Sequence, residues 1–472
     1  MIAPNDSLDD RAMSHARMHA ESSSDPSPAQ EVAQLQKVEE LPAFSKVQHG
    51  DLLELALSAN TTSLTHGLHR FPAKYIPQIP RWALREFGTR DSIVLDPFMG
   101  SGTTLVEGLC AASVSYGIDV DPLARLISRA KTAAYDMERI VALSEQLFAS
   151  ERTRPAASFL PMHGVANVEH WFGQSAWSDL CVLFRAIDLL PCSLEEREFF
   201  LAVFSSILRV VSNADDQTQK TYVSGTLKKS PPPVWDTFRR FLGRAINGAR
   251  ALEDGARFGS AKILDATALD IPLPKASVDL VVTSPPYLDS VDYMYNFMLE
   301  YFWLGPYLGV PSRADFNRMR RAPVGAKNPT LKTGSMPSSI TELVAIGDMP
   351  KYRRAAVVAY FEAMNLHFEE ASRVLKRGGR YVLVVGNSQA QTGVIPVHDC
   401  LLRVARAAGL HMEKAFAYRI RRHYMKFPRK GRGGIILMDW VITLRKTGKA
   451  LLPIEDRLPM PNVKIGNDEV AN

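Results

Sequence analysis

The stretch that decides the fold is Ser92-Ile-Val-Leu-Asp-Pro-Phe-Met-Gly-Ser-Gly-Thr-Thr-Leu-Val-Glu-Gly-Leu109. Its apolar start predicts a short buried strand, and Thr103–Leu109 has the spacing of an amphipathic helix. Gly100 and Gly102 lie at the junction, where glycine lets backbone N–H groups approach a ligand closely. The order of strand, glycine turn and helix predicts a ligand site at the carboxyl end of a strand.

A second strand and an acid follow this turn. Val114–Asp119 reads as a strand that ends in a carboxylate, the arrangement by which Rossmann-like sheets hold a ribose through its hydroxyls. We therefore predict that Asp119 is a ribose ligand. No Gly-Lys-Ser/Thr follows the glycines, which disfavours a triphosphate loop. Taken alone, a strand-to-helix turn with no ligand remains an alternative.

A second motif lies much further along the chain. Val278–Thr283 is a continuous apolar run, typical of a buried parallel strand, and it leads into Ser284-Pro-Pro-Tyr287. Prolines have no N–H, so the Ser284 hydroxyl and the Pro285 carbonyl are expected to accept hydrogen bonds from an exocyclic amino group. Tyr287 offers a face on which a ring can stack. A plain Pro-Pro-Tyr turn is the alternative reading of these four residues alone.

The rest of the chain alternates strands and helices. Tyr381–Ser388 reads as a buried strand and turn after a helix that closes at 376–379, residues 398–409 as a helix, and Asp439–Leu444 as a last strand. This alternation predicts an α/β fold, with a Rossmann-like sheet and helices on both of its faces.

The two motifs together resemble those of the amino-group DNA methyltransferases, which methylate cytosine at N4 or adenine at N6 with S-adenosylmethionine. The resemblance covers roughly residues 60–135 and 260–445. It implies catalysis by the loop Ser284, Pro285, Pro286 and Tyr287. It implies cofactor binding by Lys74, Asp96, Pro97, Phe98, Gly100, Ser101, Gly102, Thr103, Thr104, Asp119, Asp265 and Ala266. Lys74 belongs to His66–Pro77, which resembles the element that closes over the methionine moiety.

The resemblance also bears on the target. Family members that act at cytosine N4 more often begin the catalytic loop with Ser, as Ser284 does here, so cytosine N4 is favoured over adenine N6. The cofactor motif precedes the catalytic loop, whereas many cytosine-N4 enzymes have the reverse order. The implied partners are double-stranded DNA and a cognate restriction endonuclease. An RNA or protein-amide methyltransferase and a DNA-binding module without activity are the alternatives.

The domain organisation is predicted from composition and periodicity. We expect a disordered leader over 1–45 and a tail over 449–472. Residues 46–135 and 259–448 would form the two halves of the catalytic domain. Residues 136–258 show helical spacing broken by a polar stretch, which predicts a helical insert that is a candidate for DNA contact.

Composition agrees with this interpretation. The chain has 472 residues, a hydrophobic content of 46% and a net charge of +6, and the sign of that charge suits a polyanionic partner. No apolar run approaches the roughly twenty residues that span a bilayer. The four cysteines form no Cys-x-x-Cys pair, so neither a metal knuckle nor a disulfide framework is indicated. We expect a cytoplasmic enzyme that needs no metal.

Three basic stretches are candidates for phosphate contact, because cationic clusters release counterions from nucleic acid. The residues are Lys220, Lys228 and Lys229 in the insert, Arg320 and Arg321 in a Gly/Pro-rich loop, and Arg421, Arg422, Lys426, Arg429 and Lys430 near the end of the catalytic half. A solvated basic face is the alternative for each. His66 and His69 flank the cofactor element, and structural or capping roles suit them at least as well as chemical ones.

Overall fold

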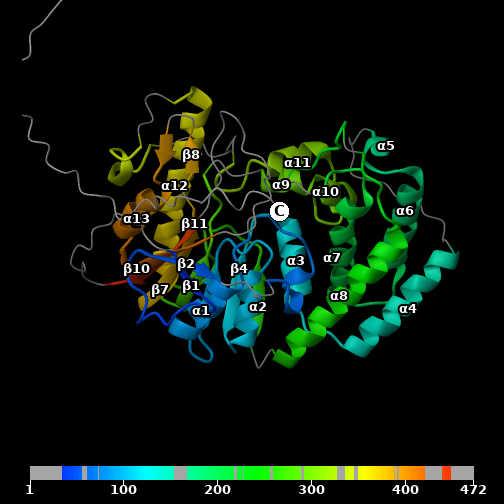
Figure 1. Ribbon diagram of the computed structural model, residues 1–472, viewed down its shortest axis with the longest axis horizontal. Coiled ribbons are helices and arrows are strands. Elements are labelled where there is room, and N and C mark those ends of the chain that lie inside the picture. The colour runs from blue at the N-terminus through cyan, green and yellow to red at the C-terminus, as the bar shows by residue number, and fades with distance from the viewer. Residues whose placement is uncertain are drawn as a thin grey trace, which may run out of the picture. The chain divides into compact units, whose positions relative to one another are not determined.

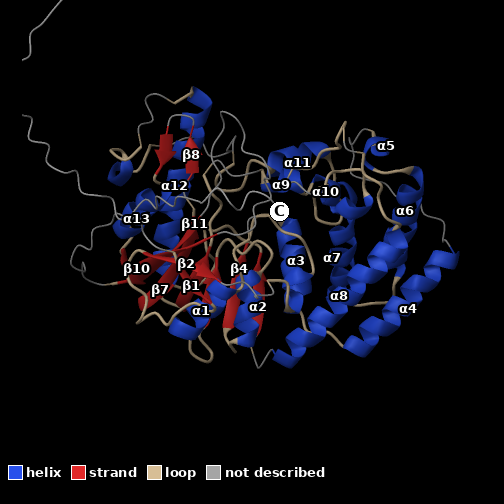
Figure 2. Ribbon diagram, viewed as in Figure 1, coloured by secondary structure: helices blue, strands red, loops and turns tan. Residues whose placement is uncertain are grey.

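The computed structural model describes residues 35–55, 61–72, 74–153, 167–216, 220–226, 228–255, 259–288, 292–326, 335–344, 349–386, 388–390, 393–419 and 438–447 (Figure 1). All of them lie within one compact unit, Leu35–Met460. The fold is α/β, with the strands gathered in one part of this unit and a group of helices beside them (Figure 2).

The described strands form a nine-stranded mixed sheet in the order β1-β2-β10-β11-β7-β6-β3-β4-β5. All neighbouring strands pair in parallel except β11, which is antiparallel to both β10 and β7. A separate hairpin joins β8 and β9. The strands are β1 (Gln36–Val38), β2 (Asp51–Leu55), β3 (Ile93–Asp96), β4 (Val114–Ile118), β5 (Ser260–Leu264), β6 (Val278–Thr283), β7 (Leu375–Val385), β8 (Ser388–Ala390), β9 (Gly393–Ile395), β10 (Leu410–Arg419) and β11 (Met438–Lys446).

The central strands are buried because apolar side chains occupy both of their faces. Leu95 and Val281 are partners in the parallel pairing of β3 with β6, and both side chains have no exposed surface. One face of the sheet packs against α1 (Gln78–Phe87), whose Trp82 and Leu84 lie in the same apolar cluster as Val94 and Val282. This cluster fixes the strands that carry both sequence motifs.

Other helices complete the sheet part of the molecule. The helix α2 follows β3, α12 contacts β7, and α13 contacts β10. The remaining bounds in this part are η1 (Leu64–Gly67), α2 (Thr103–Cys110), α3 (Pro122–Thr132), η2 (Ser338–Ile340), α12 (Lys351–Val374) and α13 (Val397–Ala407).

A second apolar core lies among the helices beside the sheet. It includes Phe199 and Phe204 of α7, Phe238 of α8 and Trp303 of α10, all nearly or completely buried. Leu126 of α3 belongs to the same core, so α3 links this helical group to the sheet (Figure 1). The helices are α4 (Met137–Thr153), α5 (Val168–Trp171), α6 (Gln174–Leu189), α7 (Leu194–Val211), α8 (Val234–Gly255), α9 (Tyr293–Asn296), α10 (Met298–Leu304) and α11 (Arg313–Met319).

The structure differs from the sequence expectations in three places. The helix expected to close at 376–379 ends at Val374, and β7 begins at the next residue, because Leu375 already pairs with Val278 of β6. The strand β10 was not predicted. Gln36–Val38, inside the predicted leader, form β1, and Leu41 is buried. Residues 1–34 of that leader and the tail from 449 onward lie outside the described residues.

Candidate active site

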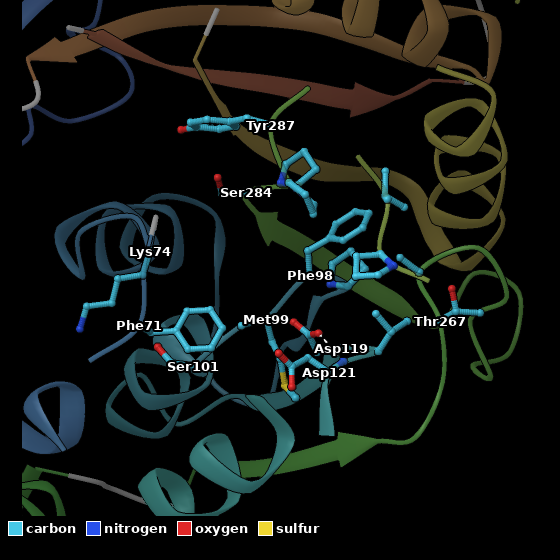
Figure 3. Close-up of a pocket in the computed structure, with 18 of the residues that line it drawn as sticks. Phe71, Lys74, Phe98, Met99, Ser101, Asp119, Asp121, Thr267, Ser284 and Tyr287 are labelled. Carbon is cyan, nitrogen blue, oxygen red and sulfur yellow. Dashed lines mark hydrogen bonds between the residues drawn. The ribbon is translucent and has the colours of Figure 1, made fainter. Parts of the chain in front are cut away.

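The two sequence motifs lie at the same edge of the sheet. The strands β3 and β6 are parallel neighbours, so the turn after Asp96 and the turn after Thr283 leave from adjacent carboxyl ends. Open α/β sheets bind ligands at this edge. Ser101 and Ser284 line one pocket between the two turns (Figure 3). The structure therefore brings the two motifs to one pocket.

Asp96 connects the two turns through its buried carboxylate. Oδ1 accepts a hydrogen bond from the Thr283 hydroxyl at 2.6 Å, across 187 residues of sequence, and one from the Phe98 amide at 3.2 Å. Oδ2 accepts from the hydroxyls of Thr104 at 2.5 Å and Tyr75 at 3.0 Å. Burial raises the pKa of Asp96, and these donors oppose that shift. The side chain of Asp96 thus connects the turn after β3 to the end of β6.

The glycine turn has a backbone that suits only small residues. Gly100 and Gly102 have φ angles of 50° and 76°, in the left-handed region. A Cβ at Gly102 would lie 2.9 Å from the Ser128 hydroxyl oxygen. That hydroxyl donates to the Gly100 carbonyl at 3.0 Å, and the Lys131 ammonium donates to the Ser101 carbonyl, also at 3.0 Å. The helix α3 therefore fixes both carbonyls of the turn.

The amino end of α2 faces the pocket without a side-chain cap at Gly102. A helix start of this kind attracts negative charge through its N–H groups and its dipole. The Ser101 hydroxyl oxygen lines the same pocket; it is buried and has no hydrogen-bond partner among the described residues. A buried polar atom without a partner is costly, so this wall suits a polar ligand group such as a carboxylate.

Asp119 follows β4 at the next strand end and lines the pocket. Its two oxygens accept hydrogen bonds from the amides of Gly100 and Asp121, each at 2.9 Å. Burial, with a contribution from the charge of Asp121, raises the pKa of Asp119 to about 7. A carboxylate oxygen can accept more than one hydrogen bond, so these contacts orient Asp119 and leave capacity for ligand hydroxyls.

Prolines and an anchored tyrosine form the opposite wall. Ser284, Pro285, Pro286 and Tyr287 all line the pocket. The Tyr287 hydroxyl donates to Asp439 of β11 at 2.7 Å, and Tyr418 of β10 donates to the other oxygen of Asp439 at 3.1 Å. Burial raises the pKa of Asp439 to about 6. The hydrogen bond to Asp439 holds the ring of Tyr287 along the wall that is uppermost in Figure 3.

The predicted cofactor residues divide into two groups. One group lines the pocket: Lys74, Pro97, Phe98, Gly100, Ser101, Thr103 and Asp119. The other group is absent from the lining: Asp96, Gly102, Thr104, Asp265 and Ala266. The side chains of Asp96 and Thr104 are used in the internal hydrogen bonds described above.

Asp265 lies away from the pocket lining. Its carboxylate is 85% exposed and forms an ion pair with Arg125 at 3.0 Å. The chain enters the pocket two residues later, through Thr267–Leu269. Cofactor binding by Asp265 therefore remains a prediction, because the side chain lies outside the pocket lining in this structure.

The pocket also contains residues that the motifs did not indicate. The additional lining residues are Phe71, Pro72, Tyr75, Met99, Val120, Asp121, Thr267, Ala268, Leu269, Met294, Ala322, Pro323 and Val324. Most of them adjoin a motif residue, which was the available signal. No sequence signal indicates the segment Ala322–Val324, because its position at the pocket depends on the conformation of the loop after α11.

The two histidines of the upstream element have structural contacts. His66 Nε2 lies 2.9 Å from a carboxylate oxygen of Glu107, and His69 Nε2 lies 2.9 Å from the Ser205 hydroxyl. Burial lowers the pKa of His69 to about 3, so its ring is neutral. Lys74 donates to the His66 carbonyl at 3.0 Å, and burial lowers the pKa of Lys74 to about 8.

The predicted phosphate contacts are only partly described. Lys228 and Arg321 are exposed, as is Lys220. Lys229 donates to the carbonyls of Arg209 and Ala214, and lies 3.2 Å from the carboxylate of Asp216. Arg320 is ion-paired with Asp292 beside the pocket. The remaining candidates lie outside the described residues: Arg421, Arg422, Lys426, Arg429 and Lys430.

Metal-binding clusters and membrane-spanning helices are both absent from the described ranges. In that part of the chain, no group of three or more His, Cys, Asp or Glu side chains is arranged to hold a metal ion. Among the helices described there, none combines the length and the apolar character that crossing a bilayer requires.

Comparison with known proteins agrees with the site. The family model for DNA methylase, of the N6/N4 type, matches residues 18–128. The type II methyltransferase M.MvaI of Kocuria varians is 27% identical over 404 residues, which cover 79% of this chain and 86% of that protein. M.MjaII of Methanocaldococcus jannaschii is 37% identical over 87 residues, 18% of this chain and 16% of that protein.

A solved structure was also compared. TrmN from Thermus thermophilus is 13% identical, with 79% of this chain and 49% of that chain covered, and its TM-score is 0.28. The family model and the relatives agree with the resemblance of the chain to the amino-group DNA methyltransferases, enzymes that modify N4 of cytosine or N6 of adenine. The methyl donor of this family, and of this chain, is S-adenosylmethionine.

Proposed function

We propose that the protein is a site-specific type II DNA methyltransferase that acts on cytosine N4. The observation that carries this proposal is the single pocket shared by the glycine turn and the Ser284–Tyr287 loop. One wall offers a helix start and an acid to a charged nucleoside cofactor. The other offers hydrogen-bond acceptors to an amine. This pairing fits methyl transfer between a sulfonium and an amino nitrogen.

We assign the cofactor to the wall formed by the glycine turn. The buried Ser101 hydroxyl and the start of α2 would hold the carboxylate of its methionine end, and Asp119 would accept hydrogen bonds from the ribose hydroxyls. Thr267–Leu269 and Phe98 would flank the adenine. When bound, S-adenosylmethionine supplies an electrophilic methyl group on a sulfonium, and the residues of this wall orient it.

The catalytic loop would overcome the weak nucleophilicity of the target nitrogen. The lone pair of an exocyclic amine is conjugated with the ring, so the enzyme must favour a pyramidal nitrogen. The Ser284 hydroxyl and the Pro285 carbonyl would accept both N–H hydrogens and turn them out of the ring plane. The nitrogen lone pair would then form the new N–CH3 bond as the S–CH3 bond of the donor breaks, and one N–H proton would leave to water, directly or through the Ser284 hydroxyl.

The target base must be rotated out of the duplex to reach this loop. Tyr287 would supply the stacking that the base loses, and its bond to Asp439 fixes the ring in advance. Preorganisation of this kind lowers the entropic cost of binding the base. Asp439 therefore acts as a positioning residue.

We further propose that the helical insert of residues 136–258 and the loop around Arg320 and Arg321 contact the DNA. Exposed Lys220, Lys228 and Arg321 supply positive charge there. The basic residues of 421–430 would add to this surface. The relatives are type II methyltransferases, which supports a recognition site shared with a cognate restriction endonuclease.

The test is methyl transfer followed by analysis of nucleosides. Duplex DNA, RNA and protein are incubated in parallel with the chain and labelled cofactor, and the modified DNA is digested for mass spectrometry. We expect label in duplex DNA alone, as N4-methylcytosine. Exclusive N6-methyladenine would contradict the choice of cytosine, and label only in RNA or protein would contradict the DNA substrate.

A further inference from the structure

A second cavity lies next to the cofactor pocket, on the other side of the segment Gly67–Pro72. Its volume is about 300 Å³, and Pro72 lines both spaces. Residues of α7, α8, α9 and α10 form the rest of its wall, in the helical group beside the sheet (Figure 1). Gly67 and Asp216 at its edge are exposed, so the cavity opens to solvent.

Two buried polar side chains line this cavity and lack hydrogen-bond partners on other residues of the described part of the chain. Asn296 is 4% exposed, and neither its amide nitrogen nor its amide oxygen has a hydrogen-bond partner in the described part of the chain. Glu300, one helical turn further on, is 5% exposed, and no other residue among those described donates a hydrogen bond to its carboxylate. Buried groups of this kind are costly unless a ligand or water satisfies them.

The charges around the cavity are mixed. Arg70 and Arg209 line it, and their positive charges act on Glu300 from beyond ion-pair distance. Arg209 donates to the carbonyls of Asp215 and Lys220, which fixes its position. Burial raises the pKa of Glu300 to about 7, and a hydrogen bond from its own backbone amide and the charges of Arg209 and Arg70 oppose this shift only in part. The rings of Phe241 and Phe297 complete the lining.

This combination has the chemistry of a base-recognition site. An amide that offers a donor beside an acceptor pairs with the edge of adenine, and a carboxylate accepts from the amino group of cytosine. Aromatic rings offer surfaces for stacking, and arginine attracts phosphate. We propose that this cavity binds an unpaired nucleobase that carries an exocyclic amino group, with its phosphate near Arg70.

The ligand would come from the substrate DNA or from a free nucleotide. The first source rests on the proposed function, whereas the second does not. Thymine is disfavoured in either case above pH 7, where Glu300 is ionised, because thymine presents carbonyl oxygens where the carboxylate needs a donor. The site is separate from the Ser284 loop, because two packed rings lie between the two spaces. Phe71 lines the cofactor pocket and Phe297 lines the second cavity, and their ring centroids are 5.2 Å apart.

The experiment is calorimetric titration of the full chain at pH 8.5, where Glu300 is ionised, with the protein saturated with the unreactive cofactor analogue sinefungin. The probes are dAMP, dCMP, dGMP and dTMP. We expect saturable binding of the first three, with dTMP at least tenfold weaker. Asn296→Ala should weaken the three amino nucleotides at least tenfold, and Glu300→Gln should reduce the difference from dTMP. Asn247→Ala, at an exposed position of α8 outside both pockets, is the matched control and should bind them unchanged.

Several results would overturn the proposal. These are no saturable binding of any nucleotide, equal binding of dTMP, or wild-type binding by Asn296→Ala with an unchanged melting temperature. Loss of binding in Ser284→Ala would place the nucleotides in the catalytic pocket instead. If a duplex oligonucleotide competes with the nucleotides for this cavity, the ligand comes from DNA. If the oligonucleotide does not compete, the ligand is a free nucleotide. None of these results depends on methyl transfer, so the proposed function is tested separately.

Discussion

The turn after β3 and the turn after β6 lie side by side, yet one is built from glycines and the other from prolines. The glycine turn brings the amino end of α2 to the pocket and tolerates φ angles of 50° and 76° at Gly100 and Gly102. Pro285 and Pro286 have no N–H, so their backbone offers acceptors only. In the proposed function, this difference suits one wall to an anionic cofactor end and the other to an amine, and Asp96 connects the two turns.

The largest expected effect tests the acceptor wall. Ser284→Ala should lower kcat by about 10²–10³-fold, the range typical for loss of one hydrogen bond made in the transition state. The dissociation constant of the cofactor should remain within a factor of about three, because Ser284 lies on the opposite wall. Steady-state kinetics and calorimetry measure the two effects. Ser277→Ala, in a partly exposed position before β6 and outside the pocket, is the control and should have the kcat and cofactor affinity of wild type.

The second prediction tests the connection between the turns. Asp96→Asn replaces an acceptor by a donor within a buried group of hydroxyls, so at least one hydroxyl loses its partner. We expect the free energy of unfolding to fall by about 3 kcal/mol, measured by urea denaturation. Cofactor binding and turnover should weaken together. A variant of wild-type stability that loses only one of the two would contradict the role of Asp96 as the common support.

The third prediction tests the cofactor wall. Asp119→Ala should weaken cofactor binding by about 10–100-fold, because hydrogen bonds to a charged group contribute about 1.5–3 kcal/mol each. Turnover at saturating cofactor should change much less. Asp265→Ala is the informative comparison, since its carboxylate is exposed and paired with Arg125. An equal loss of affinity in Asp265→Ala would show that the loop moves to place this acid against the adenine.

The smallest effect concerns pH. The pKa of Asp119 is raised to about 7, and ribose hydroxyls donate hydrogen bonds to its charged form. Binding must therefore release a proton below pH 7, and cofactor affinity should fall by up to about tenfold per pH unit as pH decreases from 7. Calorimetry between pH 5.5 and pH 8.5 measures this dependence. The slope should be absent in Asp119→Asn, and a slope that persists there would assign the proton to another group.

The elements that carry the motifs were predictable because their sequence signals are local. The apolar run Val278–Thr283 coincides with β6, and the helix expected from Thr103 begins at that residue as α2. By contrast, β10 carries charged residues such as Glu413 and Lys414 among its apolar ones, which hides its alternation. Its stability comes from neighbours far away in sequence, including pairing with β2 and β11.

The site shows the same limit. Asp119 and Ser284 lie in the pocket as expected, because each directly follows a buried strand. Asp96 was expected to bind the cofactor, but its carboxylate is turned to Thr283 and Tyr75, contacts that form only when the sheet is assembled. The Tyr287–Asp439 bond joins residues 152 positions apart, and no local pattern indicates it.

The most direct test of the shared pocket is a crystal structure with sinefungin and a duplex oligonucleotide that carries the methylation site, identified by sequencing modified bases in DNA exposed to the enzyme. We predict an extruded cytosine stacked on Tyr287, with its amino group hydrogen-bonded to the Ser284 hydroxyl and the Pro285 carbonyl. The same amino group should face the analogue bound beside Asp119. A target base that remains paired in the duplex, or one held away from Ser284 while the analogue occupies the glycine turn, would contradict the account.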